Sequence, residues 1–126
     1  MTYPVGRTLR PYQLEAVDAV ETAWAQGTSR PAVVLPTGSG KSTVIAALAT
    51  RARARGQRVV MLAHRGELLS QMADSVHQVD PAGQRVGIVQ ASRRQTGAEI
   101  VSASFQSLGT VRRVADLGRR DIVLCD

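Results

Sequence analysis

Five short apolar segments, set among stretches with helical periodicity, constrain the fold of this chain more than any other feature. The segments AVVLP, RVVMLAH, RVGIVQ, EIVSAS and DIVLC are rich in valine and do not alternate strictly between apolar and polar residues. This pattern is typical of parallel strands that are covered on both faces. Candidate helices lie at residues 11–27, 40–56, 65–78 and 104–118. Repeated strand, helix, strand units predict an α/β domain whose parallel sheet has helices on both faces.

The first predicted helix, residues 11–27, has an apolar face and an acidic face. Its apolar side chains recur at helical spacing from Leu14 to Trp24, and Gly27 is a suitable stop. An acidic row from Glu15 to Glu21 lies on another face. We interpret that row as a solvated helix surface.

Size and charge limit the function. The 126 residues, 44% of them apolar, are enough for the core of one domain. No apolar run approaches the ~20 residues that span a bilayer, and the N-terminus lacks an apolar signal-peptide core, so we expect a cytoplasmic protein without a membrane partner. Cys125, the single cysteine, is expected to be a small core residue. The net charge of +6 favours a polyanionic partner such as nucleic acid.

One lysine stands among sixteen basic residues, and it lies in the segment LPTGSGKST between a predicted strand and a predicted helix. Gly38 and Gly40 let backbone N–H groups converge on an anion, and the helix N-terminus adds its positive end. Lys41 supplies a compact charge that can reach the β and γ phosphates of a nucleotide, and Ser42 is placed to ligate Mg²⁺. A plain strand-to-helix turn is the structural alternative. The combination of segments predicts a phosphate-binding loop.

Several motifs in sequence order carry a resemblance to a known family. A full P-loop begins with a glycine where this chain has Leu35, and the form from Pro36 to Ser42 instead resembles motif I of superfamily 2 helicases and translocases. LRPYQLEAV resembles the element ahead of motif I whose glutamine contacts adenine. VVMLAHRGELLSQ resembles motif Ia, VSASFQSL motif Ib, and DIVLCD the strand that leads into motif II. The Ala63-His64-Arg65 form of motif Ia is similar to the branch that holds restriction-enzyme translocase subunits and DNA repair helicases.

The resemblance implies a RecA-like domain that uses ATP and Mg²⁺ to drive translocation on nucleic acid, DNA rather than RNA. By the same resemblance, Lys41 and Asp126 are the catalytic residues, and Ser42 and Asp126 hold the metal. The implied nucleotide contacts are Gln13, Pro36, Thr37, Gly38, Ser39, Gly40, Lys41, Ser42 and Thr43, and the implied nucleic-acid contacts are His64, Arg65, Ser104 and Gln106.

Structural alternatives stay open for these positions. Gln13 could be an ordinary surface residue, His64 a satisfied structural histidine, and Ser104 the cap of a following helix. Aromatic residues make up only 3% of the chain and are scattered along it, so the sequence predicts contact with the sugar-phosphate backbone and no base-stacking platform.

The end of the sequence bears on domain organisation. In the family, Asp126 would be the first carboxylate of motif II, followed by a glutamate and later by a second RecA-like domain with a transition-state arginine. We therefore expect residues 1–126 to be an incomplete N-terminal portion of the first RecA-like domain, inactive alone, with an open position in its sheet. The sequence leaves two other functions open: a small-molecule kinase of another P-loop class, and a nucleotide-responsive nucleic-acid-binding module without hydrolysis.

Overall fold

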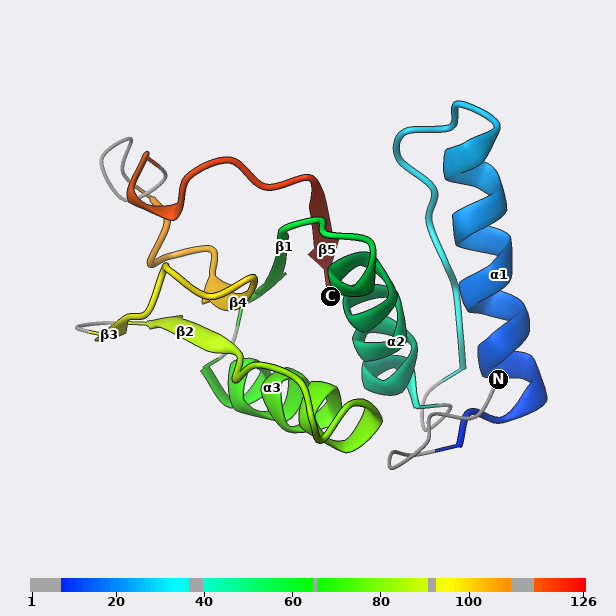
Figure 1. Ribbon diagram of the computed structural model, residues 1–126, viewed down its shortest axis with the longest axis horizontal. Helices are drawn as coiled ribbons and strands as arrows, with labels where there is room; N and C mark the ends of the chain where they lie inside the picture. Colours follow the sequence, from blue (N-terminus) through cyan, green and yellow to red (C-terminus); the bar gives the residue numbers. More distant parts are fainter. Residues whose placement is uncertain (1–7, 37–39, 65, 91–92, 110–114) are drawn as a thin grey trace.

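Three helices and one sheet make up the computed structural model, which describes residues 8–36, 40–64, 66–90, 93–109 and 115–126 (Figure 1). The predicted α/β class is confirmed, and the predicted strands form except the first. The helices are α1 (Pro11–Ala25), α2 (Lys41–Ala54) and α3 (Gly66–Val79), and the strands are β1 (Val59–Ala63), β2 (Gly87–Gln90), β3 (Arg93–Arg94), β4 (Ile100–Ser104) and β5 (Ile122–Cys125).

The sheet has the strand order β3-β2-β4-β1-β5. All neighbouring pairs are parallel except β2 and β3, which are antiparallel. Ala63 at the end of β1 stands opposite Ser104 at the end of β4, and Leu62 stands opposite Cys125 of β5. The carboxyl ends of these strands therefore share one edge of the sheet, the edge at which α/β proteins bind ligands.

Two groups of buried side chains cover the two faces of the sheet. On one face α2 and α3 pack against each other and against the strands, and the alanine-rich surface of α2 allows this close approach. Strand residues such as Met61 and Ile100 are fully buried there. On the other face Val60 and Val101 pack with Leu117 from the connection between β4 and β5, which contains a helical turn at residues 115–117. Burial on both faces explains why the sequences of β1 and β4 lack alternation.

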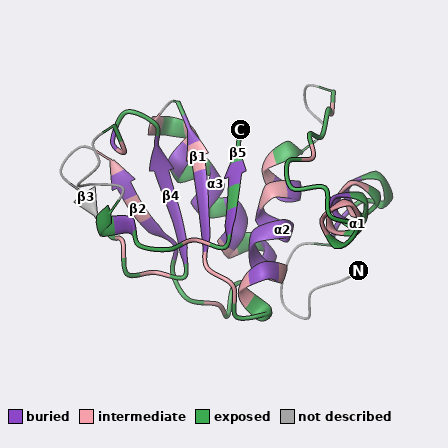
Figure 2. Ribbon diagram, turned by 90° about the horizontal axis from the view of Figure 1, so that it is seen from above, coloured by how far each residue is buried: buried purple, intermediate pink, exposed green. Residues whose placement is uncertain are grey.

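Helix α1 stands beside α2, on the side of α2 away from the sheet (Figure 2). It ends at Ala25, and Gly27 follows with φ of 93°, a left-handed conformation that glycine adopts without strain. The predicted stop at Gly27 is confirmed. None of the described helices is long and apolar enough to cross a membrane.

The predicted strand at residues 32–36 does not form. Residues 31–36 have no regular structure, and the side chains of Val33 and Val34 are 44% and 93% exposed. Strand β5 pairs with β1 on one side, and its other edge has no partner in the described part of the chain. A strand is stable only when a neighbour accepts its backbone hydrogen bonds, and residues 32–36 have no such neighbour among the described residues. Apolar character alone was insufficient to predict this element.

Three further predictions need correction. The predicted helix at 104–118 does not begin at Ser104, because residues 105–108 form a turn; residues 110–114 lie outside the described part. The stretch from Gln90 to Gly97, interpreted as a loose loop, contains β3. Cys125 is exposed instead of buried, because the side chains of β5 alternate and its outer face is uncovered.

Arg120 closes the opposite, amino-terminal edge of the sheet. Its guanidinium donates hydrogen bonds of 2.7 to 3.4 Å to the backbone carbonyls of Val59, Thr96, Ala98, Glu99 and Leu117. Burial lowers the pKa of Arg120, and the nearby charge of Arg58 lowers it further. The planar guanidinium group carries several N–H donors, so one arginine can bind a cluster of carbonyl oxygens.

Candidate functional site

The glycine-rich segment leads directly into α2. Gly40 is the N-cap residue and has φ of 81° and ψ of 44°, in the left-handed region. Its carbonyl accepts hydrogen bonds from the N–H groups of Thr43 at 3.0 Å and Val44 at 3.3 Å. Lys41 is the first helical residue and is exposed. The positive end of the helix dipole and the ammonium group therefore lie together, as an anion site requires.

Other predicted nucleotide contacts surround this point. Pro36 is exposed just before the loop, Ser42 is half-buried and Thr43 is 2% exposed. Thr37, Gly38 and Ser39 lie outside the described residues. The described half of the loop thus has the helix start that the sequence predicts.

Gln13 contacts Gly40 although it lies on a different helix. Its Nε2 is 3.5 Å from the Gly40 carbonyl oxygen, and its Oε1 accepts a 2.9 Å hydrogen bond from the Arg10 N–H. Only 5% of Gln13 is exposed, so its interpretation as an ordinary surface residue is wrong. A Cβ at Gly40 would lie 2.4 Å from Gln13 Nε2, so this approach requires glycine. The adenine contact stays a prediction.

Lys41 and Asp126 line the same cleft, whose volume is about 1200 Å³. Apolar side chains of α2, including Val44 and Leu48, line it together with residues 29–33, Leu35 and β5. The N–H of Asp126 donates a 3.0 Å hydrogen bond to the Leu62 carbonyl, which anchors Asp126 at the carboxyl edge of the sheet. The cleft lies beside the edge of β5 that has no partner in the described part of the chain, and both side chains predicted for phosphate and metal line it.

The side chains available near the cleft suit a Mg²⁺ ion whose other ligands come from a nucleotide. Within the described residues, no group of three or more His, Cys, Asp or Glu side chains could hold a metal ion. Mg²⁺ is usually bound through one or two protein oxygens together with phosphate oxygens and water. Asp126 lines the cleft, and Ser42 is the half-buried residue next to Lys41; that both hold Mg²⁺ stays a prediction.

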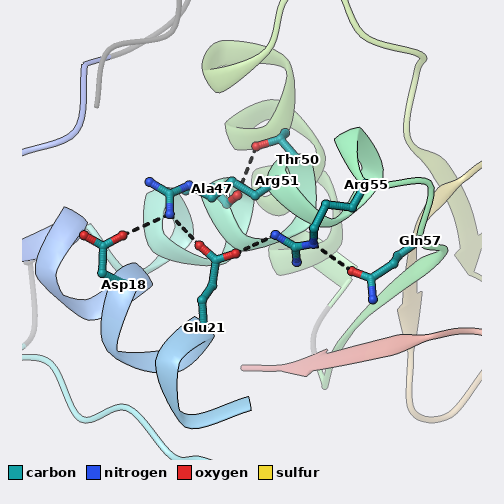
Figure 3. Close-up of polar contacts among 7 residues, drawn as sticks. All are labelled: Asp18, Glu21, Ala47, Thr50, Arg51, Arg55 and Gln57. Atoms are coloured by element: carbon teal, nitrogen blue, oxygen red, sulfur yellow. Dashed lines mark hydrogen bonds and ion pairs between the residues drawn. The ribbon is translucent and has the colours of Figure 1, made fainter. Parts of the chain in front are cut away.

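An ion-pair cluster joins α1 to α2 (Figure 3). Arg51 of α2 contacts Asp18 at 3.0 Å and Glu21 at 2.5 Å, and Arg55 contacts the other oxygen of Glu21 at 2.5 Å. The side chains of Arg51 and Glu21 are only 13% and 23% exposed. The interpretation of the acidic row as a merely solvated face is therefore wrong for Glu21, whereas Asp18 is 60% exposed and also contacts Arg51. The cluster keeps α1, which carries Gln13, against the helix that starts at Lys41.

Loss of the Glu21 charge should loosen this attachment. We expect Glu21→Gln to lower the free energy of unfolding by about 1–2 kcal/mol at low salt, because two arginines lose a partly buried partner. The effect should shrink in 1 M NaCl, where the Debye length falls to about 3 Å. Urea unfolding at both salt concentrations measures it. Glu15→Gln is the matched control, since Glu15 is exposed on the same helix; an equal, salt-independent loss in both variants would contradict the role of the ion pairs.

The predicted nucleic-acid residues lie around the ends of β1 and β4. His64 and Gln106 are exposed, and Arg65 lies outside the described residues. Ser104 is 5% exposed, and its Oγ accepts a 3.0 Å hydrogen bond from the Ser107 N–H. Its hydroxyl therefore caps the turn at residues 105–108, whereas the structural alternative expected it to cap a helix that starts there. A direct contact of Ser104 with phosphate stays a prediction.

Phe105 is a residue that the sequence did not single out. Its ring lies 4.8 Å from the ring of His64, centroid to centroid. The aromatic residues are scattered along the sequence, but these two rings are neighbours in the folded structure. The signal was available only through strand register: His64 and Phe105 each follow the last paired residue of a neighbouring parallel strand.

Comparison with known proteins gives one family. A family model described as "Type III restriction enzyme, res subunit" matches residues 7–126. No curated protein matches the chain.

Proposed function

Since the chain belongs to the type III restriction enzyme res-subunit family, a family of superfamily 2 helicase N-terminal domains, we propose that it binds Mg-ATP in the cleft between Lys41 and Asp126 and contacts DNA. The family is one of ATP-dependent, helicase-like proteins that act on nucleic acid. Preference for DNA over RNA, translocation along the strand and a cytoplasmic location are the finer parts of the proposal.

One observation carries the nucleotide part. Lys41 stands at the N-terminus of α2, immediately after a left-handed glycine, and shares a cleft with Asp126 at the carboxyl edge of a parallel sheet. The ammonium group and the positive end of the helix dipole would attract the negative phosphate chain, and the carboxylate would attract the metal ion bound to that chain. A cleft for an uncharged ligand would not require this combination.

Each residue has a role in the proposal. Gly40 permits close approach of the loop backbone, and Lys41 binds the β and γ phosphates. Ser42 and Asp126 would hold Mg²⁺, which when bound neutralises phosphate charge as it develops. Gln13, held beside Gly40, would contact adenine. The remaining proposed nucleotide contacts are Pro36, Thr37, Gly38, Ser39 and Thr43.

ATP hydrolysis and movement along DNA need further structural elements besides the residues named above. We include in the proposal a second RecA-like domain and a further strand that completes the sheet. The edge of β5 has no partner in the described part of the chain, Val123 is 54% exposed, and Val33 across the cleft is exposed as well. These features support an additional strand between β5 and Val33, which would leave the end of the cleft at Lys41 and Asp126 for Mg-ATP. Residues 1–126 would then be the N-terminal portion of an ATP-binding domain.

The test is titration calorimetry with Mg-ATP and, separately, with single-stranded DNA. We expect residues 1–126 to bind both ligands without steady ATP turnover. Absence of nucleotide binding would overturn the nucleotide part of the proposal. Transfer of phosphate from ATP to a small acceptor would favour a kinase, and preference for RNA over DNA of the same sequence would correct the nucleic-acid class.

A further inference from the structure

Two aromatic rings meet at the carboxyl edge of the sheet. The ring centroids of His64 and Phe105 are 4.8 Å apart and their planes are inclined at 34°, within the range of stabilising aromatic pairs. Phe105 nevertheless keeps 38% of its surface exposed, and His64 is exposed as well. Both residues of the pair therefore keep part of their surface exposed to solvent, where the apolar ring of Phe105 gains nothing from water.

Backbone hydrogen bonds anchor the segment that carries Phe105 beside the end of β1. The N–H of Phe105 donates a 3.2 Å hydrogen bond to the carbonyl of Ala63, the residue before His64. The buried Ser104 hydroxyl accepts the Ser107 N–H and lies 2.6 Å from the Ser107 hydroxyl, which fixes the turn that carries Phe105. Each ring thus follows the last paired residue of a strand, so the backbone at both positions is already ordered before a ligand covers the pair.

We propose that His64 and Phe105 form a stacking platform for one base of a single-stranded nucleic acid. This inference rests on the proposed function and adds base contact to the backbone contact that the sequence predicts. Every base has a flat π surface, so stacking would be tolerant of sequence. A base seated there would cover the exposed ring surface, while its flanking phosphates would face a chain of net charge +6.

The position of the platform agrees with this occupant. His64 follows β1, and β1 pairs with β4 on one side and with β5 on the other. Asp126, at the end of β5, therefore lies at the same edge of the sheet as the ring pair and lines the proposed nucleotide cleft. A nucleic-acid strand bound by the two rings would lie at the same edge of the sheet as the cleft, where the presence or absence of nucleotide could affect it.

The experiment compares two oligonucleotides of equal length and charge: oligothymidylate and an abasic strand that has the same backbone without bases. Fluorescence anisotropy measures the affinity of residues 1–126 for each at one fixed salt concentration, because phosphate contacts are strongly salt-dependent. We expect the natural chain to bind the base-containing strand about tenfold or more tightly. Phe105→Leu should reduce this preference to near unity, and Phe105→Tyr, which keeps a ring, should retain it.

Tyr12→Leu is the matched control, because Tyr12 is a 37% exposed ring on α1 and its loss should leave the preference unchanged. Equal affinity of the natural chain for the two strands would overturn the stacking platform and leave the proposed function intact. No binding to either oligonucleotide would overturn both the platform and the nucleic-acid part of the proposed function. A preference that survives in Phe105→Leu would also overturn the platform. Should that variant fail to fold, the comparison of the two strands with the natural chain still decides.

Discussion

Replacement of Lys41 by alanine should weaken Mg-ATP binding by about 10- to 100-fold, the loss expected when a charge-assisted contact worth about 1.5–3 kcal/mol disappears. Lys41 is exposed at the first position of α2, so its side chain supports little of the packing. The free energy of unfolding should change by less than about 0.5 kcal/mol. Titration calorimetry and urea unfolding of the same preparations separate the two effects.

Two variants test whether position 41 needs a lysine or only a positive charge. Arg119→Ala removes the same charge from a side chain that is 91% exposed, and it should leave Mg-ATP affinity unchanged. Lys41→Arg keeps the charge but introduces a planar, bulkier group, and it should bind Mg-ATP less tightly than the natural chain. Equal losses in Lys41→Ala and Arg119→Ala would indicate a long-range charge effect and would contradict a direct phosphate contact.

Replacement of Gly40 by alanine should damage both folding and nucleotide binding. The left-handed backbone costs a residue with a Cβ roughly 1–2 kcal/mol. The new methyl group would also lie 2.4 Å from Gln13 Nε2, so the Gln13 amide would have to move. We expect a loss of about 1–2 kcal/mol in the free energy of unfolding and at least a tenfold loss in Mg-ATP affinity, because the helix start and its neighbour would no longer keep their positions.

Gly56→Ala supplies a close comparison at the other end of the same helix. Gly56 has φ of 80°, nearly equal to the 81° of Gly40, but nothing lies within 4 Å of a Cβ built on it. This variant should lose a similar free energy of unfolding and keep full Mg-ATP affinity. If both variants lose nucleotide affinity to the same extent, the contact between Gly40 and Gln13 has no part in binding.

Short-range features of this protein could be predicted from the sequence. The start of α2 at Lys41 follows from a glycine-rich turn before a helical segment, and helix α1 stops near Gly27 as expected. The apolar segments of β1, β2, β4 and β5 were each located to within two residues. A helix forms its hydrogen bonds between residues four apart, and a strand covered on both faces needs a continuous apolar run. Both can therefore be recognised in a short stretch of sequence.

Tertiary structure decided which of these segments have partners. Residues 32–36 have the composition of a strand, yet no neighbouring backbone in the described chain pairs with them. Glu21 lies 30 residues from Arg51, and only the packing of α1 on α2 joins them. His64 and Phe105 become a pair because β1 and β4 are adjacent in register. Backbone pairing in sheets and side-chain contact between elements link residues distant in sequence, so they depend on how the whole chain packs.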